Sequence, residues 1–111
     1  MKVLDTYGRT GPTSLVLKMT ADSNVMAYGA FLIHLPDQQD VAQWDSGVLE
    51  SNAGGQATLN QPTGYAIVVV PIVSATQATL HATLTLNGVK VFDQDVTIPA
   101  KEAFGWVVTI N

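Results

Sequence analysis

The chain contains no cysteine among its 111 residues. This absence excludes a disulfide framework, a zinc site built on thiolates and a thiol nucleophile. It does not distinguish one cellular compartment from another, because exported proteins built of β-strands can also lack cysteine. Helical patterning is missing as well. No window of useful length shows apolar residues with a 3.6-residue period, so we expect no helix.

Charged residues are also scarce. They make up 13% of the chain, against about 25% in an ordinary globular domain. Between Ser51 and Val89 there is no Asp, Glu, Lys or Arg at all. An uncharged polar surface is easier to desolvate than a charged one, and charged residues are depleted at the centres of interfaces. The span therefore predicts contact with another copy or a neutral partner, or central strands covered on both faces.

Basic side chains are few and scattered, and the net charge is −4. The five basic residues are Lys2, Arg9, Lys18, Lys90 and Lys101. Binding to nucleic acid or to an anionic membrane surface requires clustered cations. We therefore expect neither of these partners.

Long hydrophobic runs are missing too. The first four residues are followed at once by polar ones, including Asp5 and Arg9, which is unlike a signal peptide. The longest apolar run, 66–73, is interrupted by Pro71. It is far shorter than the about 20 residues of a membrane helix. We therefore expect a soluble chain that does not insert into a membrane.

The chain instead shows a period of two residues and many β-branched side chains, which predict strands. The expected strands cover 15–20, 25–35, 41–49 (interrupted by a turn), 56–60, 65–73, 76–86, 89–98 and 104–110. A turn is expected at 7–12 and a flexible loop at 51–55, both rich in glycine and polar residues. Gly29 indicates a bulge or bend, and the imperfect alternation around Gln94 indicates a second bulge.

The most specific signal is a hairpin. Residues 76–86 alternate cleanly, with threonines and His81 on one side and five apolar residues on the other: Ala78, Leu80, Ala82, Leu84 and Leu86. Asn87-Gly88 follows and leads into the strand 89–98. Asn-Gly favours a type I′ turn, because both central positions of that turn require positive φ.

Residues 25–35 and 65–73 are apolar on both faces, which is typical of strands in the middle of a sheet or at an interface. Short, regularly spaced strands without a helix predict one domain, residues 1–111. We expect an all-β, antiparallel two-sheet sandwich of about seven or eight strands. The hairpin is similar to those of immunoglobulin-like and jelly-roll modules, a likeness of architecture that carries no function.

Acidic residues form two loose clusters, one of Asp37, Asp40, Asp45 and Glu50 and one of Asp93 and Asp95. Calcium takes six to eight oxygen ligands, often carboxylates from loops, so both clusters are candidates, although their spacing matches no EF-hand. The second pair lies two residues apart on a strand and repels unless another group compensates. The alternative is that these carboxylates are simply solvated, and we expect no cofactor.

Catalytic signals are weak. The two histidines, His34 and His81, are too few for a zinc site with three or four ligands. We expect His81 on a threonine-lined outer face with no carboxylate beside it. No nucleophile motif of the Gly-x-Ser-x-Gly or Ser-x-x-Lys type occurs, and no two carboxylates can be paired across a cleft. We therefore expect a protein that is not an enzyme.

Two aromatic side chains are candidates for binding. Trp44 lies beside turn residues and is expected to be partly exposed, and Tyr28 lies on a strand that is apolar on both faces. Trp106 shares a face with Phe104 and Val108, so we expect it in the core.

These patterns favour a non-catalytic binding or assembly module. It would form a homo-oligomer, or dock a protein partner, through uncharged strand surfaces. The alternative is a lectin-like module that binds a carbohydrate or calcium through its acidic loops. The candidate binding residues are Trp44, Asp37, Asp40, Asp45 and Tyr28.

Overall fold

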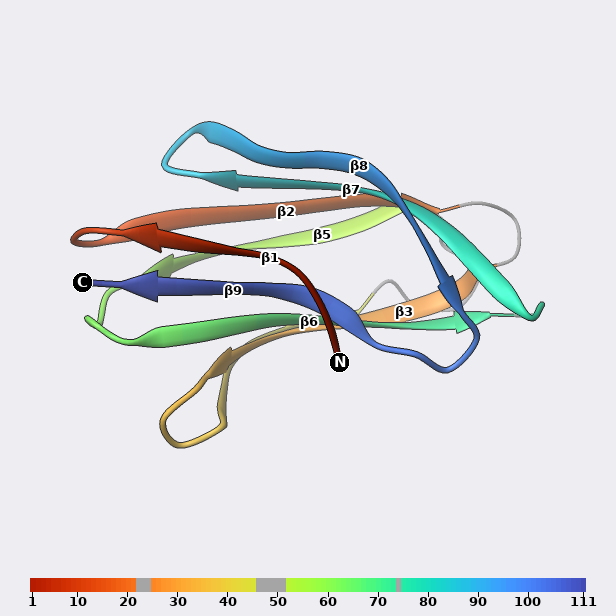
Figure 1. Ribbon diagram of the computed structural model, residues 1–111, viewed down its shortest axis with the longest axis horizontal. Helices are drawn as coiled ribbons and strands as arrows, with labels where there is room; N and C mark the ends of the chain where they lie inside the picture. The colour runs from red at the N-terminus through yellow and green to blue at the C-terminus, as the bar shows by residue number, and fades with distance from the viewer. Residues whose placement is uncertain (22–24, 46–51, 74) are drawn as a thin grey trace.

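The computed structural model describes residues 1–21, 25–45, 52–73 and 75–111, which form nine strands in two facing sheets (Figure 1). The five-stranded sheet consists, in spatial order, of β1 (Lys2–Arg9), β9 (Phe104–Ile110), β6 (Gly64–Val73), β3 (Val25–His34) and β4 (Gln39–Asp45). The four-stranded sheet consists of β5 (Asn52–Leu59), β2 (Thr13–Ala21), β7 (Gln77–Leu86) and β8 (Val89–Pro99). The predicted sandwich is confirmed, with nine strands rather than seven or eight.

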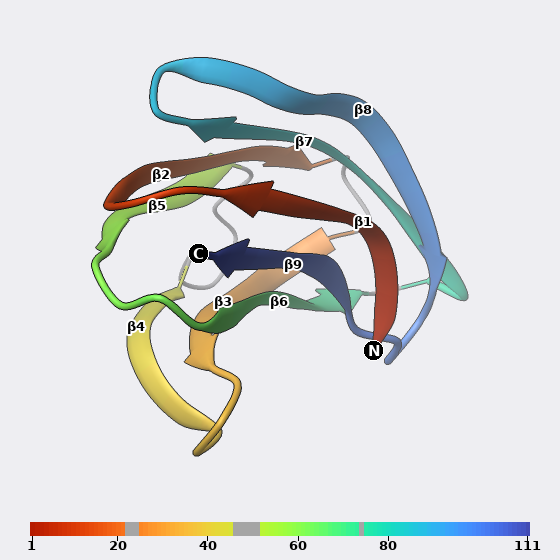
Figure 2. The ribbon, with the colours of Figure 1, turned by 60° about the vertical axis from the view of Figure 1, so that its left-hand side comes forward.

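The two sheets form two layers (Figure 2). Neighbouring strands are antiparallel throughout, except that β1 runs parallel to β9. The strand expected at 41–49 corresponds to β4, which ends at Asp45. Residues 46–49 lie outside the described residues. No helix in the described ranges is long and apolar enough to cross a membrane.

Strand β1 is the element that the sequence pattern does not predict. A turn was expected at 7–12, but β1 continues through residues 7–9 of that range. Most side chains of β1 are exposed, so its alternation is weak, and it is held by backbone pairing with β9. The Tyr7 hydroxyl donates to the carbonyl of Val91 on β8 at 3.4 Å, and burial raises the pKa of Tyr7 to about 12. β1 therefore links the edges of the two sheets.

Hydrophobic side chains from the facing sides of both sheets form one core. The five predicted inward residues of β7 are all buried, as are the inward residues of β2 from Thr13 to Met19. Trp106 is fully buried, as predicted, and meets the rings of Phe92 and Phe104 edge-on with centroids 5.2 and 5.8 Å away. Each fully buried side chain of this kind contributes about 1.5–3 kcal/mol. This core holds the sheets face to face.

The bulge expected at Gly29 is not there, because Gly29 pairs regularly with both neighbouring strands. The irregularities beside β3 lie at Met26 and at Val41 instead. An extra residue in a strand changes the face on which the side chains beyond it lie. Val41 is such a residue, and it places Asp40 opposite Ile33, on the outer side of the sheet. The bulge therefore keeps a carboxylate out of the core.

The bulge expected near Gln94 lies at Val91. Without it, Lys90 would share the inward side of β8 with Phe92. The extra residue places Lys90 opposite Thr85, on the outer side. The ammonium group thus stays in water and avoids the cost of desolvating a charge, while Phe92 packs against the core.

Residues 51–55 do not form the expected loop: all except the first belong to β5, and that first residue lies outside the described ranges. A side chain at Gly54 would collide with the backbone of Leu17, and one at Gly55 with the indole ring of Trp44. These glycines therefore allow close contact, Gly54 with the neighbouring strand β2 and Gly55 with Trp44 of the other sheet, and do not mark a flexible loop.

The Asn87-Gly88 hairpin is confirmed. Both residues have positive φ, 49° and 77°, as a type I′ turn requires. Asn87 also joins the turn to β2. Its backbone N–H donates to the carbonyl of Ser14, and its Oδ1 accepts from the Ser14 N–H, both at 2.8 Å. The turn therefore sets the β7–β8 register and its place beside β2.

We expect Gly88→Ala to lower the free energy of unfolding by about 1–2 kcal/mol, because a residue with a Cβ is strained at positive φ. Gly8→Ala is the matched control, since the φ of Gly8 is not positive. A Cβ added at either position meets no atom within 4 Å, so the two changes differ in backbone conformation and not in crowding. Urea denaturation measures both, and equal losses would contradict the assignment of the turn.

Candidate functional site

Apolar side chains cluster on the outward side of the five-stranded sheet, mainly on its interior strands. We call the following residues the outer apolar face: Val3, Phe31, Ile33, Val68, Val70, Ile72 and Val107. Cross-strand pairing places them on one side of the sheet. Phe31 is opposite Val68, and Gly105 pairs with both Val68 and Val3. Val3, Val70 and Ile72 are 47%, 37% and 57% exposed. Within the described ranges the four-stranded sheet lies on the opposite side of these strands. The Met1 side chain lies over Gly105, between Val3 and Val68.

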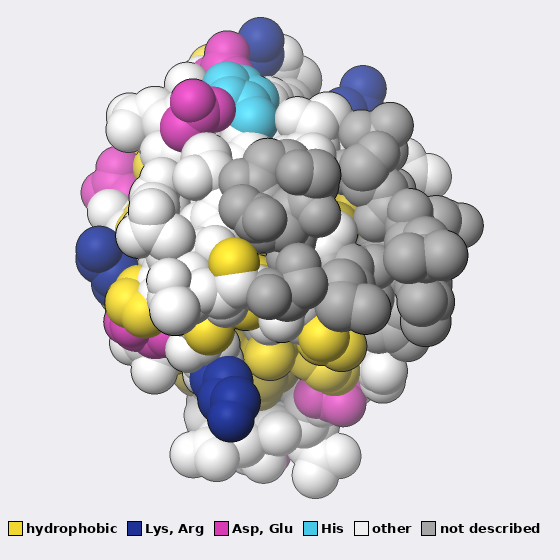
Figure 3. Space-filling model, turned by 90° about the vertical axis from the view of Figure 1, so that its right-hand side faces the viewer, with side chains coloured by type: hydrophobic (Ala, Val, Ile, Leu, Met, Phe, Trp, Pro, Cys, Tyr) yellow, Lys and Arg dark blue, Asp and Glu magenta, His cyan; other side chains and the backbone are white. Residues whose placement is uncertain are grey.

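This face contains a hollow at one end. Val70, Pro71, Ile72 and Val73 line it together with Ala75, Ala100 and Lys101. Figure 3 looks at that end of the molecule and shows hydrophobic side chains gathered beside a basic one. A single cation at the rim of an apolar hollow leaves its floor uncharged.

Charge is absent from the strands that carry most of this face. β9, β6 and β3 contain no Asp, Glu, Lys or Arg. Two carboxylate residues of the edge strand β4 pair with β3, Asp40 opposite Ile33 and Asp45 opposite Gly29. The charge-free span thus supplies two strands of the interior, β6 and β7, but one side of β6 is left in contact with water.

A second, polar hollow of about 290 Å³ lies between the β3–β4 turn and the β5–β6 connection. Its lining residues are His34, Asp37, Gln39, Val41, Thr58, Asn60, Gln61 and Tyr65. Figure 1 shows both connections at the same end of the sandwich. We call this feature the polar hollow.

Hydrogen bonds hold the wall of the polar hollow in place. His34 Nδ1 lies 2.9 Å from Asp37 Oδ1, which also accepts from the Gln39 N–H at 3.1 Å. The backbone N–H of Gln39, and then the ring of His34, lower the pKa of Asp37 below its ordinary value. The His34 ring rests on Tyr65 with centroids 5.6 Å apart, and the Tyr65 hydroxyl accepts from the Gln61 N–H. Asp37 is therefore ionised at neutral pH beside a fixed imidazole.

The structure does not gather the predicted binding residues into one site. Asp37 lines the polar hollow, but Asp40 does not. Trp44 is partly buried against Gly55, on the inner side of β4. Tyr28 is only 2% exposed and its hydroxyl lies 3.5 Å from the Met19 carbonyl, so core packing leaves it no surface for a ligand.

Two further acidic candidates fall outside the description. Asp45 ends β4 opposite Gly29, but its side chain is not among the described parts of the chain. Glu50, with the rest of 46–51, lies outside the described residues altogether. Sequence reasoning also missed His34, Gln39, Asn60 and Gln61. Their only local signal is that they flank two turns, and the two turns meet only in the folded chain.

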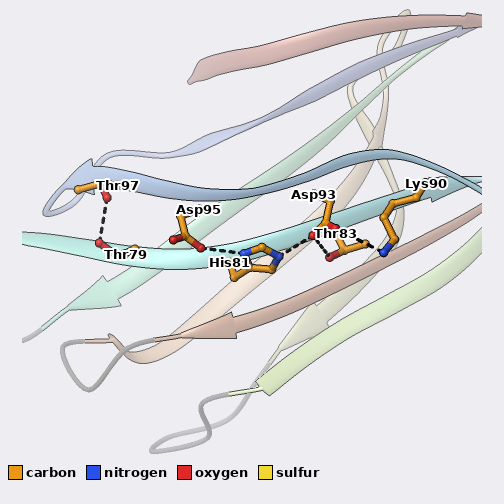
Figure 4. Close-up of polar contacts among 7 residues, drawn as sticks. All are labelled: Thr79, His81, Thr83, Lys90, Asp93, Asp95 and Thr97. Carbon is orange, nitrogen blue, oxygen red and sulfur yellow. Dashed lines mark hydrogen bonds and ion pairs between the residues drawn. The ribbon is translucent and has the colours of Figure 1, made fainter.

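The outer side of β7 and β8 carries a third feature, a row of hydrogen-bonded polar side chains (Figure 4). His81 was expected to have no carboxylate beside it, and this is wrong. Its Nδ1 lies 2.7 Å from Asp95 Oδ1 and its Nε2 lies 2.5 Å from Asp93 Oδ1. Thr83 and Lys90 also contact Asp93, at 3.2 and 3.4 Å. His81 is thus the group that compensates the repulsion between the two carboxylates.

Protonation follows from this geometry. Both ring nitrogens of His81 can donate only in the imidazolium form. The hydrogen bond to Asp95, then that to Asp93, raises the pKa of His81, and the hydrogen bond from His81 lowers the pKa of Asp93. Lys18 of the neighbouring strand β2 is a further charged residue on this side. It pairs with Thr83, two residues after His81 on β7.

The same geometry bears on metal binding. The two nitrogens of an imidazole point in opposite directions, so His81 bridges Asp93 and Asp95 instead of converging with them on one ion. In the part of the chain that the structure describes, no group of three or more His, Cys, Asp or Glu side chains is placed to hold a metal. No family model and no curated protein sequence matches the chain, so its own residues carry the argument for function.

We expect His81→Gln to destabilise the protein most between about pH 4 and pH 6.5. A raised histidine pKa stabilises the fold below the ordinary value of about 6.5, and this effect is lost as pH rises through the higher folded value. A lowered Asp93 pKa stabilises the fold above about 3.9, and this effect is lost as pH falls through the lower folded value. Urea denaturation of both proteins across pH 2–9 measures the difference.

Thr85→Gln, on the same side of β7, is the control and should show no such pH dependence. A difference between wild type and His81→Gln that stays constant with pH would contradict the paired arrangement of His81.

Proposed function

We propose that the chain is a non-catalytic assembly module that pairs with a second copy of itself through the outer apolar face. The observation that carries this proposal is an apolar patch on one sheet face, in which three large aliphatic side chains are between 37% and 57% exposed. Contiguous apolar patches of this kind on a soluble protein mark interaction sites. The other outer side of the sandwich carries His81, two carboxylates and threonines, and is suited to water instead.

A second copy is the occupant that the charge pattern favours. Two-fold pairing places the same patch of both subunits in contact, so any net charge on the patch meets a like charge. β9, β6 and β3 carry none. The part of the face on these three strands is neutral and apolar, and is therefore complementary to itself.

The size of the face is consistent with such a pair. The face lies on four strands, β1, β9, β6 and β3, which at a spacing of about 4.8 Å and a length of about 23 Å cover roughly 440 Å² in flat projection. Side chains that stand up from the sheet add to this area. The smallest specific interfaces bury about 600 Å² on each partner, so the outer apolar face is suited to a weak dimer at the low end of that range.

We expect Val70→Glu and Ile72→Glu each to weaken dimerisation at least tenfold, because each buries a carboxylate against its symmetry mate. Light scattering after size-exclusion chromatography, over a hundredfold range of concentration, measures the dissociation. Wild type should change from monomer to dimer within that range.

Val89→Glu is the matched control. Val89 is the same residue type as Val70, is 61% exposed at the β7–β8 turn, and gains the same charge on substitution. It should dimerise as wild type does. A wild-type chain that stays monomeric at millimolar concentration, or equal weakening by Val70→Glu and Val89→Glu, would rule out this interface.

A further inference from the structure

We infer that the polar hollow is a second binding site, for a neutral polyhydroxyl ligand of the carbohydrate class. It is lined by the two connections at one end of the sandwich and shares no residue with the outer apolar face. The inference is thus independent of the assembly proposal. Four features of the hollow support it: size, hydrogen-bonding groups, fixed geometry and charge.

Its size suits a small ligand. The hollow of about 290 Å³ lies at the lower limit of the roughly 300–1,000 Å³ found for ligand pockets. One or two sugar units are of that scale. Val41, 49% exposed, supplies an apolar wall against which the C–H side of a sugar ring can pack.

Its hydrogen-bonding groups are mixed. Gln39, Asn60 and Gln61 have amide side chains, each of which can both donate and accept, and Thr58 has a hydroxyl. When His34 is neutral and its Nδ1 donates to Asp37, Nε2 is left as an acceptor. A sugar hydroxyl is at once a donor and an acceptor, so it is matched by a wall that offers both.

Part of this wall is held before any ligand arrives. Asp37 Oδ1 takes two hydrogen bonds, from His34 and from the backbone of Gln39, which leaves Oδ2 for a ligand hydroxyl. Tyr65 is buried under the His34 ring, so it supports the imidazole and is not a stacking surface itself. Groups already fixed in place lose less entropy on binding.

Charge argues against the other ligand classes. Among the described residues no Lys or Arg lines the hollow, so phosphate, sulfate and carboxylate ligands lack a counter-charge. The one carboxylate among the described lining residues cannot supply the six to eight oxygens of a calcium site. A neutral ligand that hydrogen-bonds to a single carboxylate, an imidazole and amides is the class that remains.

A glycan array probed with the wild-type protein, followed by nuclear magnetic resonance titration with the sugar that binds, tests the inference. We expect binding of at least one class of glycan, with shifts at the Asn60 and Gln61 side-chain amides. Asp37→Ala should weaken binding at least tenfold. Asp40→Ala is the control. It removes the same charge at a position three residues after Asp37, but the Asp40 side chain does not line the hollow, so binding should be unchanged.

Circular dichroism and denaturation of both variants separate a lost site from a lost fold, and Asn60→Ala provides a second variant should Asp37→Ala unfold. An array with no bound glycan at high protein concentration would overturn the inference. Equal affinity of wild type and Asp37→Ala would do so too. Val70→Glu should retain glycan binding, so failure of the dimer and failure of this site are distinguishable.

Discussion

The structure depends on one constraint, the alternation of side-chain direction along each strand within a fold of two layers. Every second residue faces a dry core, so no charged residue can occupy that position without a large cost. Where the sequence would place a charge there, the strand gains a residue. The bulge at Val41 turns Asp40 outward, and the bulge at Val91 does the same for Lys90. These bulges are therefore part of how the core stays apolar.

The same constraint explains why the two outer sides differ. The four-stranded sheet presents polar groups outward, including the imidazolium of His81 between Asp93 and Asp95. The five-stranded sheet presents Val70 and Ile72, because its interior strands are apolar at both odd and even positions. Burial by the other sheet satisfies only one of these sides. The asymmetry leaves one outer side polar and the other largely apolar, and the proposed assembly rests on the apolar one.

The polar hollow follows a different logic, because it is built where strands end. The β3–β4 turn brings Asp37 beside His34, and the β5–β6 connection brings amide groups opposite them. Loops at the end of a rigid sandwich can carry hydrogen-bonding groups without disturbing the core. The proposed assembly and the proposed ligand binding use separate surfaces, so one does not exclude the other.

The sequence by itself determined the two-sheet architecture, the hairpin at Asn87 and the inward residues of β7, because alternation and turn chemistry are local properties of the chain. Only the tertiary structure decided the rest. β1 is held by pairing with β9 at the other end of the chain, and His81 meets Asp95 through a register that depends on a bulge. Trp44 is turned inward because Gly55, on the other sheet, leaves space for its ring. Contacts between residues distant in sequence depend on register and layer packing, which no local pattern encodes.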